Sequence, residues 1–242
     1  GFLDRDCRIY FSTYRDGIWT KPQPLPERVL PRNASATHPH VFHANGQEVL
    51  VFSSNRPGGQ GNMDLWYCTR SIGAQIQDFE LPRNLGAEIN TLGDEITPFF
   101  DPRDSLLYFS SNGHITIGGL DLFAARGFFG DWQQPINLGT PYNSPAHDFF
   151  FVKTPGIPGG YLASNRLFGL QRNDPRQFDL FHIPSPEQAY LIFGQARHSA
   201  DARPLTSVIA TLYEVDERSG KDIIIDTRLF PAGAIYSPYI RT

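Results

Sequence analysis

Three histidines lie close together near residue 40, at positions 38, 40 and 43. In an extended strand, His38 and His40 would share one face, which is the arrangement of a transition-metal pair. No third ligand is evident nearby, so histidines at a strand edge or turn are the better interpretation. We expect no metal at this position and no cofactor elsewhere in the chain.

Two pairs of neighbouring polar residues are candidates for acid and base chemistry. Asp94-Glu95 and His147-Asp148 stand at equivalent places in successive segments. They could be taken as an acid/base pair for chemistry like that of glycoside hydrolases, which use two carboxyl groups. A catalytic site is usually unique, however, whereas polar residues that recur once per segment usually satisfy backbone groups at strand ends. We therefore favour a structural role for both pairs.

A third set of polar residues suggests calcium. It comprises Asp64, Asp121 and Asp179, together with Asn55, Asn112 and Asn165. Glycine-rich loops that carry carboxylates can surround a hard cation. The first two loops offer only one carboxylate each, and the third adds only Asp174. Asp and Asn side chains that cap the N–H groups of their loops are the simpler prediction.

Sequence signatures of catalysis are missing from the chain. There is no Gly-x-Ser-x-Gly elbow, His-Glu-x-x-His pair, phosphate-binding Gly-Lys loop or dinucleotide fingerprint. Two cysteines, Cys7 and Cys68, are interpreted as buried small side chains, and a disulfide between them stays open. The sequence favours a protein that is not an enzyme.

The composition indicates which kind of structure must position these residues. The net charge of −4 provides no basic surface for a phosphate backbone, so we expect no nucleic-acid partner. The chain has 22 glycines, 20 prolines and 13% aromatic residues, which is typical of many short strands joined by turns. No apolar run approaches the roughly 20 residues of a membrane-spanning helix. We expect an all-β chain without direct membrane insertion, with any leader or anchor outside it.

An internal repeat organises residues 36 to 183. The motif Leu-Val-Phe-Ser-Ser-Asn, which ends at Asn55, returns in similar form at Asn112 and Asn165, with spacings of 57 and 53 residues. An Asp followed by an apolar and an aromatic residue returns at spacings of 57 and 58. Four strands in just over 50 residues is the size of one β-propeller blade. The residues that recur are Asn55, Arg56, Asp64, Asn112, Asp121, Asn165, Arg166, Asp179, Trp19 and Trp132.

Two details of the repeat stay open. Gly113-His114 stands where the other copies have arginine, and we interpret it as a surface variation. Residues 9–19 match residues 122–132 at an offset of 113, but residues 9–13 also align with the Ser-Ser-Asn strand. Three copies and a partial one fall below the usual four to eight blades. We therefore expect further blades upstream, or a closure strand donated by residues 1–26 to the last blade.

The sequence changes character near residue 186. Residues 1–186 are assigned to the propeller and residues 187–242 to a small Greek-key β-sandwich that is shorter than a complete module. The predicted strands of the second part cover residues 190–196, 207–215, 222–228 and 234–240.

Several of these motifs resemble a known family. The Ser-Asn-Arg, Gly-Gly, Asp-Leu-Phe, Trp-Gln-Gln-Pro and Asn-Leu-Gly series resembles the TolB-type, WD-repeat-like propeller of OmpA-family outer-membrane proteins, over residues 1–185. Residues 193–215 are similar to the opening of a carboxypeptidase-regulatory-like sandwich, an accessory domain without zinc ligands. This domain order resembles the PorE-like proteins of the type IX secretion system.

The resemblance implies a lipoprotein scaffold in the periplasm, associated with the outer membrane. Its expected partners are other secretion-system or envelope proteins, and peptidoglycan would be bound by a domain outside this chain. Variable loops are the expected binding surface, with Arg70, Phe79, Leu167, Phe168 and Arg172 as candidate residues. The alternatives are a TolB-like module of envelope integrity and a propeller enzyme that acts on glycans.

Overall fold

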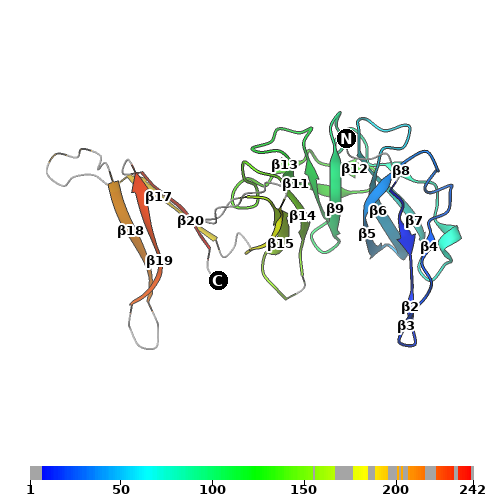
Figure 1. Cartoon of the computed structure of the whole chain (residues 1–242), viewed down its shortest axis with the longest axis horizontal. Coiled ribbons are helices and arrows are strands. Elements are labelled where there is room, and N and C mark those ends of the chain that lie inside the picture. Colours follow the sequence, from blue (N-terminus) through cyan, green and yellow to red (C-terminus); the bar gives the residue numbers. More distant parts are fainter. Residues whose placement is uncertain are drawn as a thin grey trace. The chain divides into compact units, whose positions relative to one another are not determined.

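The computed structural model describes residues 7–154, 156–166, 177–184, 189–195, 201, 203, 207–215, 222–231 and 234–240. These residues form strands β1 to β20 and one 3₁₀ turn, and every pair of these strands is antiparallel (Figure 1). The all-β prediction is confirmed. The chain divides into two compact units, Gly1–Ile183 and Pro184–Thr242, close to the boundary expected from the sequence.

Three repeats of similar topology make up most of the first unit. The first repeat (residues 36–94) contains β5 (Ala36–Ala44), β6 (Gln47–Ser54), β7 (Asp64–Ser71), η1 (Ile76–Asp78) and β8 (Arg83–Asn84). The second repeat (residues 95–147) contains β9 (Glu95–Asp101), β10 (Leu106–Ser111), β11 (Asp121–Phe128), β12 (Asp131–Trp132) and β13 (Ile136–Asn137). The third repeat (residues 148–183) contains β14 (Asp148–Val152), β15 (Gly160–Ser164) and β16 (Asp179–Ile183). Within each repeat the strands pair in chain order, and β12 forms a separate hairpin with β11.

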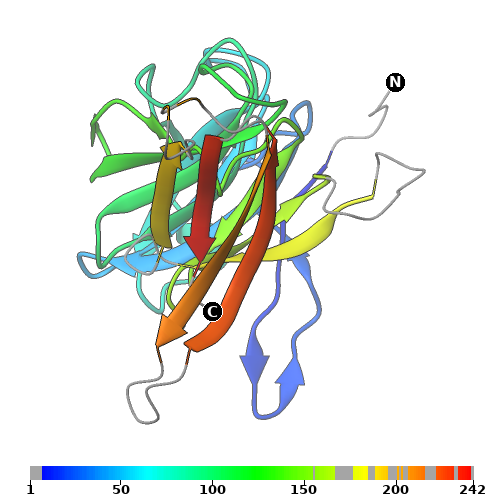
Figure 2. The same ribbon diagram turned by 90° about the vertical axis from the view of Figure 1, so that its left-hand side faces the viewer.

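A half repeat (residues 7–35) precedes them. Its strands are β1 (Tyr10–Phe11), β2 (Tyr14–Arg15), β3 (Ile18–Trp19) and β4 (Gln23–Pro24). The pairs Tyr10↔Pro24 and Tyr14↔Trp19 reproduce Phe123↔Asn137 and Gly127↔Trp132 at an offset of 113 residues. The register therefore supports the alignment with residues 122–132. Figures 1 and 2 both show the β2–β3 hairpin projecting from the first unit.

The half repeat packs against the first repeat. Ile9 and Leu25 share a core with Phe52, Trp66 and other side chains of the first repeat. The expectation that residues 1–26 donate a closure strand to the last copy is therefore wrong for the described residues. Ile9 and Leu25, which adjoin β1 and β4, already bury their side chains against the first repeat, their neighbour in sequence.

In the first two repeats, β5 to β7 and β9 to β11 each contribute side chains to two cores. Along β7, Leu65 belongs to the core between the first and second repeats, while Trp66 and Cys68 belong to the core shared with the half repeat. Successive side chains of a strand point to opposite faces. This explains why the sequence of these strands does not alternate between apolar and polar residues.

The first strand of every repeat carries a bulge at the same position. The pairing register shifts at this point, and His38, Thr97 and Phe150 adopt φ values of 50°, 52° and 57°. The three bulges meet: the His38 and Phe150 rings lie 5.1 Å apart, and the Phe150 N–H donates to Thr97 Oγ1 at 3.2 Å. The first strands of the three repeats therefore converge, although no described sheet closes on itself.

The second unit consists of two antiparallel strand pairs. Its strands are β17 (Ala189–Gln195), β18 (Ser207–Val215), β19 (Asp222–Pro231) and β20 (Ala234–Ile240). β17 pairs with β20, and β18 pairs with β19. All four strands lie where the sequence predicts them. Among the described residues, no helix is long and apolar enough to cross a membrane.

Candidate functional site

The repeated aspartates cap the loops that precede them. Asp64, buried at the start of β7, accepts hydrogen bonds from the backbone N–H groups of Gln60 and Gly61, at 2.5 and 3.0 Å, and from the Asn84 amide at 2.8 Å. The second repeat has the same three bonds between Asp121 and Ile117, Gly118 and Asn137. The capping role predicted for Asp64 and Asp121 is confirmed. Asp179 follows a loop, residues 167–176, that lies outside the described residues.

An asparagine relay continues from each aspartate. Asn84 accepts from the side-chain amide of Asn90 at 2.9 Å, and Asn90 bonds both the N–H and the C=O of Leu65. Asn137, Asn143 and Leu122 repeat these contacts in the second repeat. In the part of the chain that the structure describes, no group of three or more His, Cys, Asp or Glu residues is arranged to hold a metal ion. The carboxylates of Asp64 and Asp121 and the asparagines that continue from them therefore serve to fix the backbone of their own repeats.

The repeated Asn that follows the second strand of each repeat links one repeat to the next. Its side-chain oxygen accepts the backbone N–H that comes just before the first strand of its own repeat. The donors to Asn55, Asn112 and Asn165 are Ser35, Asp94 and His147, at 2.8, 2.7 and 2.8 Å. These residues therefore hold strand ends together, which explains their recurrence.

Each of the two pairs considered for acid and base chemistry has one carboxylate that is buried inside the protein. Glu95 is fully buried and accepts from the N–H and hydroxyl of Thr91 and from the Ser111 hydroxyl, at 2.8, 2.7 and 2.7 Å. Asp148 is equally buried; it accepts from Ser144 and forms an ion pair with Arg166 at 2.6 Å. Carboxylates saturated in this way support the structural interpretation that the sequence favours.

Arginine and histidine play the same part at the Ser-Asn-Arg position. In each repeat a cationic or imidazole side chain lies against an aromatic ring and donates to a backbone carbonyl. The rings belong to Trp66, Phe123 and Phe181, and the carbonyls to Val29, Ile89 and Tyr142. His114 therefore replaces Arg56 and Arg166 by reaching the Ile89 oxygen from one position later, at 2.9 Å. Its interpretation as a surface variation is wrong.

The three histidines near residue 40 do not converge. His40 Nε2 lies 3.2 Å from the Phe100 oxygen, and its ring packs between Phe42 and Phe99. The bulge turns His38 toward Phe150 instead, while His43 is exposed beside Glu48. Burial lowers the pKa of His38 and of His40, the latter against a smaller opposite effect of the Phe100 carbonyl. His38 and His40 are packing groups.

Two of the residues expected to bind a partner are buried. Arg70 is 7% exposed and Phe79 is 1% exposed. The Arg70 guanidinium pairs with Glu48 at 2.5 Å and lies between the rings of Phe11 and Phe79. The expectation that these side chains are exposed is wrong, because both fill the junction with the half repeat. Leu167, Phe168 and Arg172, the other candidates, lie outside the described residues.

Phe79 holds the position that tryptophan has in other copies. The residue after Phe79, Glu80, donates its N–H to the Thr69 carbonyl at 2.8 Å. The residue after Trp132 makes the same bond to Arg126, and the residue after Trp19 makes it to Thr13. In the first repeat, therefore, Phe79 takes the place of the tryptophan, and the segment between the two bonded residues is longer than in the other copies.

Both cysteines are free thiols. Cys68 is buried in the core between the half repeat and the first repeat, and burial raises the pKa of its thiol to about 12. A thiol with so high a pKa is almost entirely protonated near neutral pH and is a poor nucleophile. Cys68 therefore acts as a small apolar side chain, as the sequence analysis favours.

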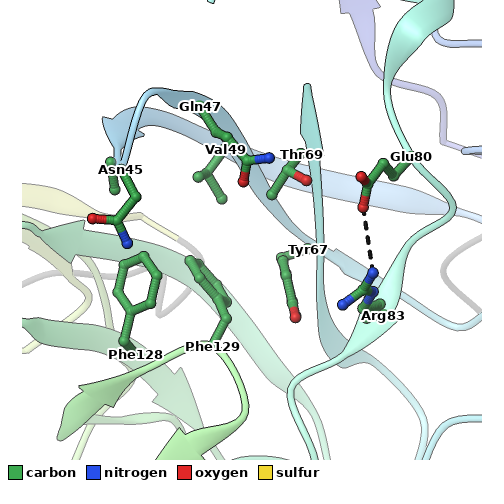
Figure 3. Close-up of a pocket in the computed structure, with 10 residues that line it drawn as sticks. Asn45, Gln47, Val49, Tyr67, Thr69, Glu80, Arg83, Phe128 and Phe129 are labelled. Atoms are coloured by element: carbon green, nitrogen blue, oxygen red, sulfur yellow. Dashed lines mark hydrogen bonds and ion pairs between the residues drawn. The ribbon is translucent and has the colours of Figure 1, made fainter. Parts of the chain in front are cut away.

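A pocket of about 260 Å³ lies between the first and second repeats (Figure 3). Its lining residues are Ala44, Asn45, Gln47, Val49, Tyr67, Thr69, Glu80, Arg83, Phe128 and Phe129. Phe128 and Phe129 belong to the β11–β12 hairpin, and the other residues come from strands and turns of the first repeat. No protein-family model, curated protein or solved structure matches this chain. We therefore infer function from the surface of the protein.

An apolar patch on the second repeat has no counterpart on the first. Ile115, Ile117 and Ile136 are 92%, 51% and 71% exposed. The backbone of all three adjoins the Asp121–Asn137 bond, because the Asn137 amide also donates to the Ile115 carbonyl, Asp121 accepts the Ile117 N–H, and Ile136 precedes Asn137. At the positions of the isoleucines the first repeat has Gly58, Gln60 and Arg83. Solvent-exposed isoleucines clustered in this way are typical of an interaction surface.

Proposed function

We propose that this chain is a non-catalytic protein-interaction module. Residues 1–186 would be part of a β-propeller, and residues 187–242 a carboxypeptidase-regulatory-like β-sandwich. The parent would be a PorE-like OmpA-family lipoprotein of the type IX secretion system, in the periplasm and associated with the outer membrane. Peptidoglycan would be bound by a domain outside this chain.

The propeller assignment is supported by the packing of the repeats. Each of the three repeats shares a core with the repeat before it, and the bulges of β5, β9 and β14 converge. Sheets that share cores on both faces and whose first strands converge are arranged as blades around an axis.

The non-catalytic role is supported by the buried carboxylates. Glu95, Asp148, Asp64 and Asp121 are each at most 1% exposed and are held by several hydrogen bonds within the protein. A general acid or base must reach the substrate proton directly or through one water molecule. These four carboxylates instead organise the backbone of their own repeats.

The observation that carries the interaction role is the exposed patch of Ile115, Ile117 and Ile136. Because the first repeat has Gln60 and Arg83 at two of these positions, the fold does not require isoleucine there. Removing apolar side chains from water contributes about 25 cal/mol per Å² of buried area. A partner protein that covers the patch would gain this contribution from all three side chains.

The proposal is tested by capture of partners from envelope extract. The immobilised chain should retain a secretion-system protein, identified by mass spectrometry. The double variant I117Q/I136R, which has the residues of the first repeat, should retain markedly less. Ile72→Gln is the matched control, because Ile72 is 54% exposed and lies outside the patch.

Three results would contradict parts of the proposal. Recovery of a Pal-type lipoprotein alone would favour the TolB-like alternative. Equal capture by wild type and I117Q/I136R would show that the patch is not the binding surface. Hydrolysis of a glycan oligosaccharide by the purified chain would favour the enzyme.

A further inference from the structure

We infer that the pocket between the first and second repeats binds a neutral sugar unit, as a single pyranose ring. This inference goes beyond the proposed protein-binding role and does not depend on it. The pocket and the isoleucine patch have no lining residue in common. We base the assignment of a sugar on the shape, the charge and the hydrogen-bonding capacity of the residues that line the pocket.

The apolar wall of the pocket is held in place by aromatic packing. The Phe129 ring stacks on Tyr67 with centroids 4.0 Å apart and an interplanar angle of 27°. Phe129 also packs edge-on against Trp132, at 5.8 Å, and Phe128 packs against Phe100 at 5.9 Å. The wall is therefore anchored in the core between the two repeats. A preformed aromatic surface can receive the C–H face of a sugar ring without reorganisation.

The polar side of the pocket carries no net charge. Glu80 and Arg83 form an ion pair at 3.4 Å, shown by the dashed line in Figure 3, and the other polar lining residues are neutral. An anionic or cationic ligand would find no unpaired opposite charge among the lining residues. A ligand that is neutral and rich in hydroxyl groups does not meet this difficulty, because each hydroxyl both donates and accepts.

The neutral polar groups of the lining are available to such a ligand. Asn45 stands at the β5–β6 turn, and Figure 3 shows its side-chain amide beside the Phe128 ring. Within the described residues, the Asn45 amide and the Thr69 hydroxyl make no hydrogen bond to protein. A Thr hydroxyl that is free to bond beside an aromatic wall is the kind of isolated polar group that fixes the orientation of a ligand.

Peptide recognition by strand addition is disfavoured here. The β7 edge that borders the pocket is already in use: Tyr67 pairs with Arg83 of β8, and the Thr69 carbonyl accepts the Glu80 N–H at 2.8 Å. An added strand needs free backbone groups along such an edge. The pocket also has the size of a single residue or ring, which suits one sugar unit.

The experiment is a titration of the whole chain with glucose, galactose, mannose and N-acetylglucosamine, followed by saturation-transfer NMR. At least one of these sugars should bind saturably. Thr69→Val removes the hydroxyl at nearly constant volume, and E80Q/R83Q removes the ion pair without adding net charge. Thr69→Val should weaken binding about fivefold to tenfold, as expected for the loss of one hydrogen bond, whereas E80Q/R83Q keeps the lining neutral and should retain binding of a neutral sugar.

Arg32→Gln is the matched control, since it breaks the exposed Glu27–Arg32 ion pair, which lies outside the pocket, and it should leave the affinity unchanged. Thermal unfolding of every variant separates lost binding from lost folding. Glu80 and Arg83 are exposed, so their replacement does not endanger the core. Saturable binding of none of the four sugars would overturn the inference. So would binding that Thr69→Val leaves unchanged or that E80Q/R83Q abolishes, or preferential binding of the neutral peptide acetyl-Gly-Asn-Gly-amide.

Discussion

Two hairpins of the same register have opposite surroundings. The β11–β12 hairpin of the second repeat buries Trp132, which is 8% exposed, whereas the β2–β3 hairpin of the half repeat leaves Trp19 66% exposed. Trp132 packs into the core that joins the first and second repeats. Trp19 touches Tyr14, with ring centroids 5.2 Å apart, and belongs to none of the three cores of the described residues. Local sequence therefore sets the hairpin, while the neighbouring repeat determines what its tryptophan contributes.

The largest expected effect comes from truncating the two tryptophans. Trp132→Ala should lower the free energy of unfolding by about 3 to 5 kcal/mol, because it removes a large buried side chain and leaves a cavity. Trp19→Ala should change it by about 0.5 kcal/mol or less, as for other exposed positions. Urea unfolding monitored by circular dichroism measures both. Similar losses in the two variants would show that the exposure of Trp19 is not a property of the protein in solution.

The asparagine relay differs between the same two regions. Leu30 of the half repeat stands where the second repeat has Asn143, which bonds the N–H and C=O of Leu122 at 2.7 and 2.9 Å. Asn143→Leu would introduce the residue of the half repeat and leave both groups buried without their partner. We expect a loss of about 2 to 4 kcal/mol in the same urea experiment, at about 1 to 2 kcal/mol for each of the two unsatisfied groups.

Asn33→Leu is the control for this substitution, because Asn33 is an exposed asparagine of the half repeat outside the relay. Its replacement should be nearly neutral. If Asn143→Leu were equally mild, the relay would be a consequence of the fold and not one of its supports.

The repeat and its strands could be predicted from sequence because their signals are local. Each copy of the motif that ends at Asn55, Asn112 or Asn165 is recognised from a few consecutive residues, and so is the match at an offset of 113 residues. The structure has the corresponding strands. Burial between repeats is not local. Phe79 was missed as the counterpart of Trp132, because a longer connection and a different residue conceal the equivalence, although the bond after it preserves the register.

The pocket could not be predicted for a related reason. Asn45, Thr69 and Phe129 come from three separate segments that meet only when the repeats pack. Arg70 was misjudged because a charged residue in a variable segment is normally exposed. Its burial depends on Glu48 and on two aromatic rings that the linear sequence does not associate with it.

The smallest expected effect is a pH dependence that arises from buried histidines, one of which, His40, lies at the junction that holds Trp132. His40 packs against Phe42 and Phe99 at this junction, and burial lowers its pKa in the folded state below the ordinary value of 6.5. The unfolded chain therefore binds the proton more readily, so acidification favours unfolding. The contribution of His40 to stability is fully present above pH 6.5 and is lost as the pH falls toward and through the lowered folded pKa.

Replacing His40 by Gln should flatten the decline of stability between pH 7 and pH 5, measured by urea unfolding at each pH. His43 is the matched control, since it lies on the same strand with a largely exposed side chain, and His43→Gln should leave the decline unchanged. Burial also lowers the pKa of His38, so part of the decline should persist in His40→Gln and disappear in the double variant with His38→Gln. If the stability of the wild type did not change between pH 7 and pH 5, the folded protein would have to accommodate the side chains of His38 and His40 in their charged form. The junction that buries Trp132 would then be more polar than its packing indicates.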